Sequence, residues 1–516
     1  MGTISRRGFL FGTAAAAAVG CTTDAAARRR PAPGEKLKAA MIGCGIQMRT
    51  ALIPQFLGKA GADGVGELVE IVATCDCDRV RAAAAAKQVN DAYGTQRCRA
   101  VHDFRDVLAD DGIDIVCIAT PDHWHAYMCV EAMTRGKDVY CEKPLTFSID
   151  EAKAVMAAQK KYGRVFQTGS MQRSWREFRT ACMIVRNGMI GELRYVDANY
   201  GRGGGAKLGG PSHPVRFFDD PANAVAEGAP NPDVDWNMWL GPARWRPYSD
   251  QLAPRGVNKF YPMFWRFDDD IGSGYNGDWG AHHLDIAQWG MDMDESGPKL
   301  IVRSDEPHSA NPLHGGRRQY GMKMVFDGKD GEIELYHGPF ACTDMAEGWG
   351  TVFYGTEGIV AVNRGRIAVW KGTGLVKPTL EIRQAVEKAE FMPGKIVAKW
   401  MGASYGTDAT VKADAGLAAA LDALDAAFRL ADAKVQLYKS PNQVRNFVEC
   451  ALSRKPTISP AETGARGATL CLLCNMSYVY DTGFEWEPKR MELRGANSKG
   501  LATGRAVYRN GWEVSC

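Results

Sequence analysis

Residues 277–285 bring a carboxylate close to two imidazoles in the sequence GDWGAHHLD. Glycines give way to helix-forming residues there, so we expect a helix with Asp278 as its N-cap. On such a helix Asp278 and His282 share one face, which Asp285 continues, whereas His283 points about 100° away. A carboxylate beside an imidazole tunes the tautomer and pKa of the ring, which favours His282 as a proton acceptor. The same pattern also fits a helix cap followed by a structural histidine. The motifs upstream decide between this structural interpretation and the catalytic one.

A second candidate site follows residues 36–42, a short apolar segment that predicts a buried strand. Residues 43–48, GCGIQM, come directly after it, and a helix pattern then begins at Thr50. A strand, a glycine turn and a helix form the setting in which backbone amides approach a pyrophosphate. Met48 replaces the third glycine of the dinucleotide fingerprint, and a tight structural turn is the alternative interpretation.

Residues 69–75 predict a second strand, which ends at Asp76. A carboxylate at this place accepts hydrogen bonds from ribose hydroxyls and repels a 2′-phosphate, so it favours NAD over NADP. The separation from the glycines exceeds the usual distance of about 20 residues, and residues 58–66 account for the difference as an extra loop. Arg79 keeps NADP as an alternative.

Strand and helix patterns alternate as far as residue 168. Further strands are predicted at residues 114–119, 138–140 and 165–168, with helices over residues 80–89 and 126–135. Such alternation predicts a doubly wound parallel sheet, in which ligands bind beyond the carboxyl ends of the strands. Four turn residues therefore converge on one edge of the sheet: Gly43, Asp76, Thr120 and Lys143.

Lys143 stands between Glu142 and Pro144, just after the strand predicted at residues 138–140. At a strand's carboxyl end its ammonium group would face the ligand cleft. There it can donate a hydrogen bond to a substrate oxygen and stabilise the negative charge that develops as hydride moves. A solvated surface lysine is the alternative for a lysine considered alone.

Taken together, these motifs resemble the Gfo/Idh/MocA family of sugar and polyol oxidoreductases over residues 36–300. The residues that carry the resemblance are Gly43-Cys44-Gly45, Thr120-Pro121 with His125, Glu142-Lys143-Pro144, the stretch QTGSMQR at 167–173, and Asp278 with His282 and Asp285. The resemblance implies an α/β chain, with an N-terminal Rossmann domain that has a doubly wound parallel sheet. A C-terminal α+β domain follows, and its open, mostly antiparallel sheet covers the nicotinamide.

The resemblance also implies roles for individual residues. Lys143, Asp278 and His282 would be catalytic: His282 exchanges the hydroxyl proton, Lys143 polarises that oxygen, and Asp278 holds the substrate or tunes His282. Substrate contacts are implied for Lys143, Arg173, Asp278, Trp279 and His282. The residues expected to contact the cofactor, NAD with NADP as the alternative, are Gly43, Gly45, Ile46, Gln47, Asp76, Thr120, Pro121, His125, Glu142, Lys143 and Gln172.

The expected domain organisation has four parts. Residues 1–34 form a signal peptide and linker, and residues 35–168 form the nucleotide-binding domain. Residues 169–484 form the α+β domain, with residues 373–440 as an insertion, and residues 485–516 form a C-terminal tail. Alternating apolar patterns predict the antiparallel strands of the second domain at residues 195–200, 322–326, 332–336, 351–354 and 359–363.

The first residues have the features of an export signal. Residues 5–10, SRRGFL, precede an alanine-rich apolar run that ends at Cys21, which is typical of the twin-arginine route. That run is too short to span a bilayer, which needs about 20 residues. Two alternatives stay open for the end of the signal: residues 25–27 fit a signal-peptidase site, and residues 18–21 resemble a lipobox in which Cys21 would be lipidated. We therefore expect a periplasmic or cell-envelope protein without a membrane span.

Composition limits the remaining classes. The chain has 516 residues and a net charge of +3. It has no basic run interleaved with aromatics, so the sequence gives no support for nucleic-acid binding. Most of its 14 cysteines lie inside apolar runs, as Cys117 does, where cysteine acts as a small buried hydrophobe. Cys471 and Cys474 form a lone pair without a second pair at zinc spacing, so we predict no metal site.

Three functions remain. An exported enzyme has no ready nicotinamide pool, so its cofactor would be loaded before export, held tightly and recycled in place. Recycling is achieved either by coupled oxidation and reduction of two sugars, as in glucose–fructose oxidoreductase, or by transient C3 oxidation during glycoside elimination. Lys143 favours direct redox, since the family's glycosidases tend to lack this lysine. A non-catalytic sugar-binding protein is the third function; in each case the partner is a carbohydrate, and we expect a homo-oligomer.

Overall fold

The structure is a computed structural model. It describes residues 34–58, 64–199, 226–257, 264–274, 276–307, 320–337, 349–387, 394–402, 414–440, 442–480, 482–505, 508–509 and 511–515. The predicted export signal and Cys21 lie outside these described residues. Within the described part of the chain, no helix combines the length and the apolar character needed to cross a membrane.

The first sheet has six parallel strands in the spatial order β3-β2-β1-β4-β5-β6. This order is that of a doubly wound dinucleotide-binding fold and confirms the predicted Rossmann domain. Its strands are β1 (Leu37–Ile42), β2 (Val69–Cys75), β3 (Arg99–Val101), β4 (Ile115–Ile118), β5 (Asp138–Cys141) and β6 (Phe166–Thr168). Strand β3 was not predicted, because three residues are too few to show an alternating pattern.

Helices cover both faces of this sheet. The helices between the strands are α1 (Ile53–Phe56), α2 (Arg79–Tyr93), α3 (Phe104–Ala109), α4 (Asp122–Thr134) and α5 (Ile149–Tyr162). A late helix, α14 (Gln443–Ser453), also belongs to this half, since Val444, Phe447 and Val448 share one buried core with strands β1 and β2. The nucleotide-binding half is therefore completed by residues far from its own segment.

The second sheet has ten strands in the order β14-β13-β12-β11-β7-β10-β9-β8-β15-β16. Only β7 and β10 pair in parallel and every other pair is antiparallel, which confirms the predicted open, mostly antiparallel sheet. The strands are β7 (Leu193–Ala198), β8 (Leu300–Pro307), β9 (Tyr320–Gly328), β10 (Gly331–His337), β11 (Thr351–Gly355), β12 (Gly358–Asn363), β13 (Arg366–Lys371), β14 (Lys395–Met401), β15 (Phe484–Glu487) and β16 (Glu492–Arg494).

Both ends of this sheet come from segments that sequence reasoning set apart. Residues 373–440, expected as an insertion, supply α11 (Leu380–Glu387), the edge strand β14 and helix α13 (Ala415–Phe428), which packs on that strand. At the other end, β15 spans the expected boundary between residues 484 and 485 and pairs with β8. These segments therefore extend the sheet instead of standing apart from it.

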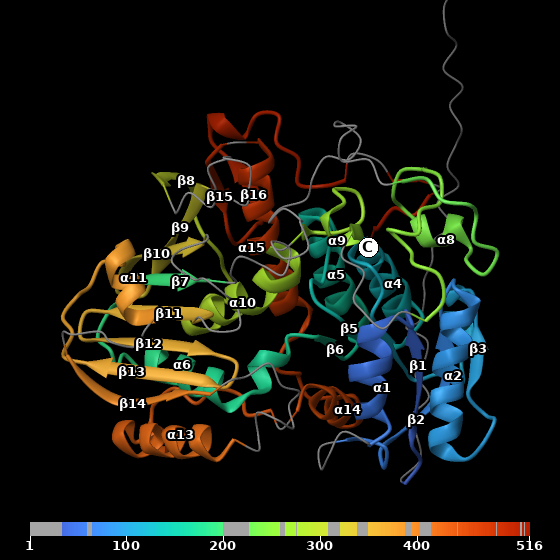
Figure 1. Cartoon of the computed structure of the whole chain (residues 1–516), viewed down its shortest axis with the longest axis horizontal. Helices are drawn as coiled ribbons and strands as arrows, with labels where there is room; N and C mark the ends of the chain where they lie inside the picture. The colour runs from blue at the N-terminus through green and yellow to red at the C-terminus, as the bar shows by residue number, and fades with distance from the viewer. Residues whose placement is uncertain are drawn as a thin grey trace, which may run out of the picture.

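Two buried helices connect the sheets. Helix α10 (Ala281–Gly290) is buried along its whole length and contacts α6 (Arg176–Arg186), α15 (Ala461–Tyr480) and strands of the second sheet. Figure 1 shows α10 and α15 between the large sheet and the helices of the parallel sheet. Because α10 is fixed on every side, the residues at its start have defined positions relative to both sheets.

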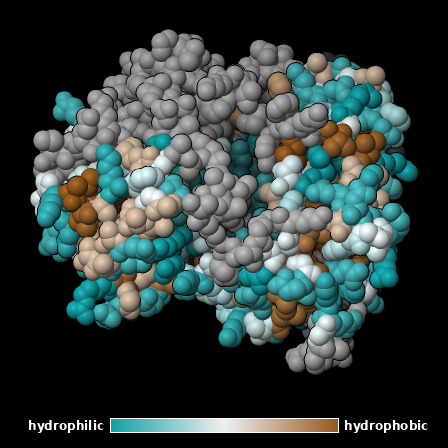
Figure 2. Space-filling model, turned by 60° about the horizontal axis from the view of Figure 1, so that its bottom comes forward, coloured by the Kyte–Doolittle hydropathy of each residue, from teal (hydrophilic) through white to brown (hydrophobic). Residues whose placement is uncertain are grey.

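All 11 described cysteines are free thiols, and ten of them are buried. This agrees with their prediction as small buried hydrophobes. No cluster of metal-ligating side chains is present in the described ranges. On the face shown in Figure 2, hydrophilic residues cover most of the described surface, with hydrophobic residues in separate patches.

Candidate active site

One cavity of about 560 Å³ runs along the carboxyl edge of the parallel sheet to the start of α10. This volume lies within the range of small-molecule and cofactor sites. Twelve of the residues expected at the site line it: Gly43, Gly45, Ile46, Gln47, Asp76, Thr120, Pro121, Glu142, Lys143, Asp278, Trp279 and His282. Three others, His125, Gln172 and Arg173, do not line the cavity.

The glycine turn after β1 forms the first part of the wall. Gly43 has φ +83°, and a Cβ atom there would lie 2.7 Å from the carbonyl carbon and oxygen of Ala119. Glycine therefore lets the turns after β1 and β4 approach one another. A Cβ at Gly45 would meet open space, and the buried Thr120 hydroxyl has no hydrogen-bond partner among the described residues. Both features leave room and hydrogen-bonding capacity for a ligand beside the turn.

Asp76 is held at the cavity wall by two backbone amides. Its carboxylate oxygens accept hydrogen bonds from the amides of Cys44, at 2.8 Å, and Asp78, at 2.9 Å. A carboxylate oxygen can accept two hydrogen bonds, so both oxygens of Asp76 keep capacity for ribose hydroxyls. Burial raises the pKa of Asp76. The cation on the cavity wall near it is Arg81; Arg79, which kept NADP as an alternative, does not line the cavity.

At the far end, Lys143 and Asp278 form an ion pair. The Lys143 Nζ donates to the backbone oxygen and to Oδ1 of Asp278, both at 2.7 Å, and the Arg266 Nε lies 3.4 Å from Asp278 Oδ2. Burial alone would raise the pKa of Asp278, but the charges of Lys143 and Arg266 outweigh burial and lower it. Asp278 is therefore an anion that holds the ammonium group of Lys143 in the cavity.

Asp278 does not cap a helix, which corrects the predicted local structure. Residues Asn276–Gly280 form a π-helical turn that continues into α10, and Gly280 precedes α10 without a side-chain cap. The wider turn directs the Asp278 side chain to Lys143 and Arg266, and no hydrogen bond joins it to His282. Asp278 therefore positions Lys143 directly and does not bond to the histidine.

His282 lies on the cavity wall and His283 lies behind it. The edge of the Trp279 ring contacts His282, with 5.7 Å between the centroids, while His283 stacks on Trp279 and faces Gly350, away from the cavity. Burial, and then the charges of Arg364 and Lys143, lower the pKa of His282. Burial lowers the pKa of His283 to about 3. Both rings are therefore neutral near pH 7, and of the two only His282 lies on the cavity wall.

Three cavity arginines were not predicted: Arg81, described above, and two at the other end of the cavity. Arg266 comes from α9 (Phe264–Phe267), and Arg364 from the turn between β12 and β13. The Arg364 guanidinium lies 4.7 Å from the centre of the Trp279 ring and donates from Nε to the Gln172 side-chain oxygen at 3.0 Å. Gln172 thus supports a cavity residue from behind. No sequence pattern distinguishes these arginines from solvated ones, because only the fold brings them to the cavity.

Arg173 is 1% exposed and does not reach the cavity. It donates from Nε to Asp285 at 2.7 Å and from Nη1 to Asp294 at 2.9 Å, and its guanidinium lies over Trp289. Two carboxylates and an indole thus occupy it, which corrects its predicted substrate contact. Arg173 and Asp285 instead fix α10 against the turn at Met171–Ser174.

His125 joins two of the turns that carry cavity residues. Its Nδ1 lies 2.7 Å from the Pro144 carbonyl oxygen and its Nε2 lies 2.9 Å from that of Thr120. Burial lowers the pKa of His125. Since its ring is 1% exposed, the expected cofactor contact is replaced by a structural role: it holds the turn after β4 beside the turn after β5.

Two models of one oxidoreductase family match the chain. The first, described as an NAD-binding Rossmann fold, covers residues 37–170, and the second, described as a C-terminal alpha/beta domain, covers residues 219–335. Both segments match the Gfo/Idh/MocA family. The family's NAD-binding domain thus coincides with the six-stranded sheet described above.

Curated relatives of this family match parts of the chain. A glycosyl hydrolase family 109 protein from Stenotrophomonas maltophilia (strain K279a) is 31% identical over 258 residues, which are 48% of this chain and 50% of that protein. An inositol 2-dehydrogenase from Salmonella typhimurium (strain LT2) is 32% identical over 151 residues, 28% of this chain and 44% of that protein. The chain thus spans half or less of the length of these curated relatives.

Solved structures share the fold. The WlbA dehydrogenase from Bordetella pertussis, in complex with NADH and UDP-GlcNAcA, has a TM-score of 0.51 at 14% identity, covering 88% of this chain and 97% of that one. A levoglucosan dehydrogenase in complex with NADH and levoglucosan has a TM-score of 0.50 at 18% identity, covering 87% and 99%. At these identities the likeness concerns the fold alone.

The residues of the cavity fit the dinucleotide that the Gfo/Idh/MocA family binds. The close approach at Gly43 and the open side of Gly45 suit a pyrophosphate beside the glycine turn. Asp76 would hold the ribose hydroxyls and Thr120 has an unused hydroxyl between the two ends. The cavity then continues to Lys143 and the start of α10, where a nicotinamide would meet its substrate.

Proposed function

We propose that the protein is an NAD-dependent oxidoreductase that transfers hydride between the nicotinamide and a hydroxyl-bearing or carbonyl carbon of a sugar or sugar derivative. The observation that carries this proposal is the common wall: the ion-paired Lys143, the neutral His282 and the dinucleotide turn line one cavity. The similarity to an inositol 2-dehydrogenase supports a polyhydroxylated substrate.

The bound nicotinamide supplies the hydride acceptor or donor. Neutral His282 takes the proton of the substrate hydroxyl, because its depressed pKa leaves a ring nitrogen able to accept one. Lys143 donates a hydrogen bond to the same oxygen while the C–H bond of the carbon that bears it breaks and the C=O bond forms. Asp278 holds Lys143 in place. In the reverse direction His282 returns the proton. The Trp279 ring provides an apolar wall against which a sugar ring can pack.

A second function is favoured by the similarity to a glycosyl hydrolase family 109 protein. In this alternative a transient C3 ketone acidifies the C2 proton, the glycosidic bond breaks by elimination, and the nucleotide ends in its starting redox state. Lys143 favours the first function, because it is placed to stabilise charge on a reacting oxygen. Incubation with aryl glycosides separates the two: release of the aryl alcohol without net change in nucleotide would support glycoside cleavage.

We further propose that the protein acts in the periplasm or cell envelope as a homo-oligomer. The twin-arginine pattern within residues 1–34 supports export. The mass of the mature N-terminus would show either cleavage after residues 25–27 or a lipid on Cys21. Light scattering of the purified protein would test assembly, and a monomer at working concentration would contradict it.

The decisive experiment is to denature the purified protein and identify the released nucleotide by mass spectrometry. Stoichiometric NAD or NADH is the expected result and supports a tightly held cofactor. NADP would contradict the role given to Asp76. If neither nucleotide is released and none binds in a titration, the oxidoreductase proposal is wrong and a sugar-binding protein becomes the better interpretation.

A further inference from the structure

The nucleotide end of the cavity is covered by a segment that lies outside the parallel sheet. We call residues 231–256 the clamp; it contains α8 (Trp236–Leu240). Three of its side chains, Met238, Trp239 and Leu252, line the cavity together with Asp76. A ligand bound at Asp76 would therefore contact the clamp as well as the sheet.

The clamp begins on the turn that carries Asp76. Asp78 and Val234 form an antiparallel bridge, the Arg79 amide donates to the Asp233 oxygen at 2.9 Å, and the Asp235 amide donates to the Cys77 oxygen at 3.0 Å. These bonds follow within four residues of the end of β2. The start of the clamp is therefore fixed directly beside the residue expected to hold the ribose.

Helix α4 holds the middle of the clamp and Arg81 holds its end. The Trp124 Nε1 donates to the Met238 oxygen at 3.1 Å, and the His123 Nε2 lies 3.1 Å from the Trp239 oxygen. At the far end the Arg81 Nε donates to the Gly256 oxygen at 3.2 Å. The clamp is thus fastened at both ends and at its middle.

The clamp has a small core of its own. Val234, Trp239, Leu240, Tyr248 and Leu252 are buried in one hydrophobic cluster. The rings of Trp236 and Trp239 stack 4.7 Å apart at an interplanar angle of 14°. A packed unit moves as one body, so opening over the cavity would require its outer contacts to break together.

The C-terminal tail adds a further set of contacts to the outside of the clamp. We call the described residues between 505 and 512 the latch. Arg509 makes four hydrogen bonds to the clamp: its amide donates to the Pro242 oxygen at 3.2 Å, its Nε to the Ala243 oxygen at 2.9 Å, its Nη2 to the Asn237 oxygen at 2.9 Å, and its Nη1 to the Asn237 side-chain oxygen. One latch residue thus holds the backbone on both sides of the end of α8.

The other end of the latch packs on the cavity wall. The Trp512 ring lies 4.9 Å from Trp124, 5.0 Å from Tyr127 and 6.0 Å from Phe104, measured between centroids. Trp124 and Phe104 both line the cavity. Through these aromatic contacts the latch connects the clamp to α4 and to the start of α3.

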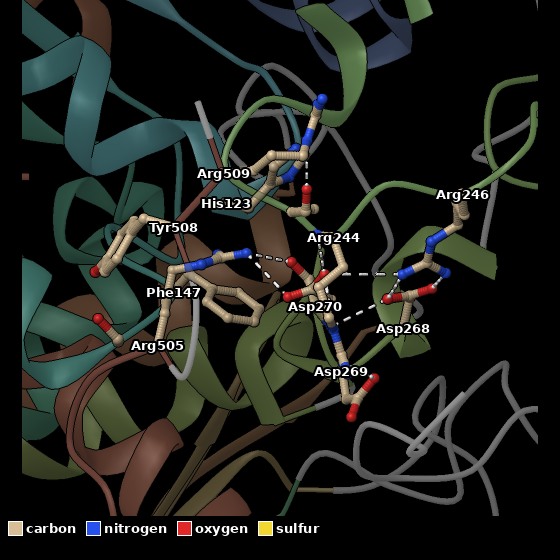
Figure 3. A network of polar contacts seen from close by, with 12 residues as sticks. His123, Phe147, Arg244, Arg246, Asp268, Asp269, Asp270, Arg505, Tyr508 and Arg509 are labelled. Atoms are coloured by element: carbon tan, nitrogen blue, oxygen red, sulfur yellow. Dashed lines mark hydrogen bonds and ion pairs between the residues drawn. The ribbon is translucent and has the colours of Figure 1, made fainter. Parts of the chain in front are cut away.

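Arg505 connects the latch to the catalytic end. Figure 3 shows its guanidinium pointing to Asp270, to whose backbone oxygen it donates at 2.6 Å and to whose carboxylate it donates at 3.2 Å, while the Phe147 ring lies beside it. Asp270 also accepts a hydrogen bond from the backbone amide of Arg244, which belongs to the clamp. Ser273 follows three residues after Asp270, on the segment that leads to Asp278. One short stretch of tail thus ties the clamp to the segment that leads to Asp278.

We propose that the latch holds the clamp over the adenosine end of the bound dinucleotide, so that the nucleotide stays on the protein between turnovers. This inference rests on the proposed function for the identity of the ligand. Arg509 and Trp512 act as positioning residues, since neither lines the cavity. Removing them leaves the residues that line the cavity in place and removes the contacts by which the C-terminal tail helps to keep the clamp closed.

The test compares nucleotide retention in three full-length proteins: the wild type, Arg509→Met with Trp512→Ala, and the control Arg494→Ala. Arg494 pairs with Glu487 at the sheet edge and is half exposed, so its loss leaves the latch untouched. Each protein is loaded with isotopically labelled NAD and chased with unlabelled NAD, and the retained label is measured by mass spectrometry. We expect label to leave the latch variant about 10- to 100-fold faster, with the control like the wild type.

Other outcomes separate this proposal from the proposed function. Equal retention in a latch variant with an unchanged circular dichroism spectrum would overturn the latch, as would a wild type that binds NAD in titration but exchanges it within seconds. A wild type that binds no NAD would overturn the proposed function itself. If the double variant does not fold, Arg509→Met alone is measured, and retention equal to that of the wild type again overturns the latch.

Discussion

Replacement of Lys143 by methionine tests the centre of the proposed chemistry. The change keeps a side chain of similar length but removes the charge and both 2.7 Å hydrogen bonds to Asp278. Asp278 keeps Arg266, 3.4 Å from its Oδ2, so the buried carboxylate is not left without a cation. We therefore expect the protein to fold, with a free energy of unfolding lower by about 1–3 kcal/mol.

The effect on turnover should be much larger than the effect on binding. Loss of one donor to a developing oxyanion costs about 10²- to 10³-fold in kcat, whereas the residues at the nucleotide end lie at other strand ends and stay intact. The assay measures kcat on a sugar substrate and the Kd of NAD by titration. The control is Lys299→Met, which removes a surface lysine paired with Asp327 and Glu332. Equal losses of turnover and NAD binding, or unchanged turnover, would refute the role of Lys143.

The same variant has a signature in pH. In the wild type the pKa of Asp278 is lowered, so this carboxylate contributes stability that is present above its unfolded pKa of about 3.9 and is lost as the pH falls through the folded value. Removing one of its two cations raises the folded pKa of Asp278. Acid unfolding of Lys143→Met should therefore begin at a higher pH than that of the wild type and of Lys299→Met.

Three further predictions concern the other cavity residues. His282→Ala should remove most turnover while His283→Ala matters less, and the reverse result would contradict the orientation of α10. Arg364→Leu removes a charge that lowers the pKa of His282, so this pKa rises and the acidic limb of the kcat profile moves to higher pH; an unmoved limb would contradict the role of Arg364. Asp76→Ala should reduce the preference for NAD over NADP, and titrations with both nucleotides that show an unchanged preference would contradict this assignment.

The nucleotide half was predictable because its signals are local. Gly43, Asp76, Thr120 and Lys143 each follow an apolar strand, and parallel pairing places such carboxyl ends on one edge without further information. The face of the helix at His282 was also readable, since helical periodicity alone separates it from His283. The wide turn before α10 was not, because periodicity does not distinguish a π-helical turn from a helix start.

Contacts between distant segments could not be predicted. Arg173 and Arg364 have the same chemistry, and only the fold places two carboxylates beside the first and two tryptophans beside the second. The clamp and the latch depend in the same way on residues about 270 positions apart, as in the bonds between Arg509 and Asn237. Strand β14 was hidden for a related reason: its residues are only partly buried, so they lack the apolar alternation of the inner strands.

The distribution of the thiols has a practical consequence. Cys75 and Cys77 line the cavity, whereas the other described cysteines do not. Burial raises the pKa of both thiols, so they react slowly with alkylating reagents near neutral pH, and a bound ligand would shield them further. The alkylation rate of the peptide that contains Cys75 and Cys77 therefore reports the fraction of unlabelled protein molecules whose cavity holds no ligand.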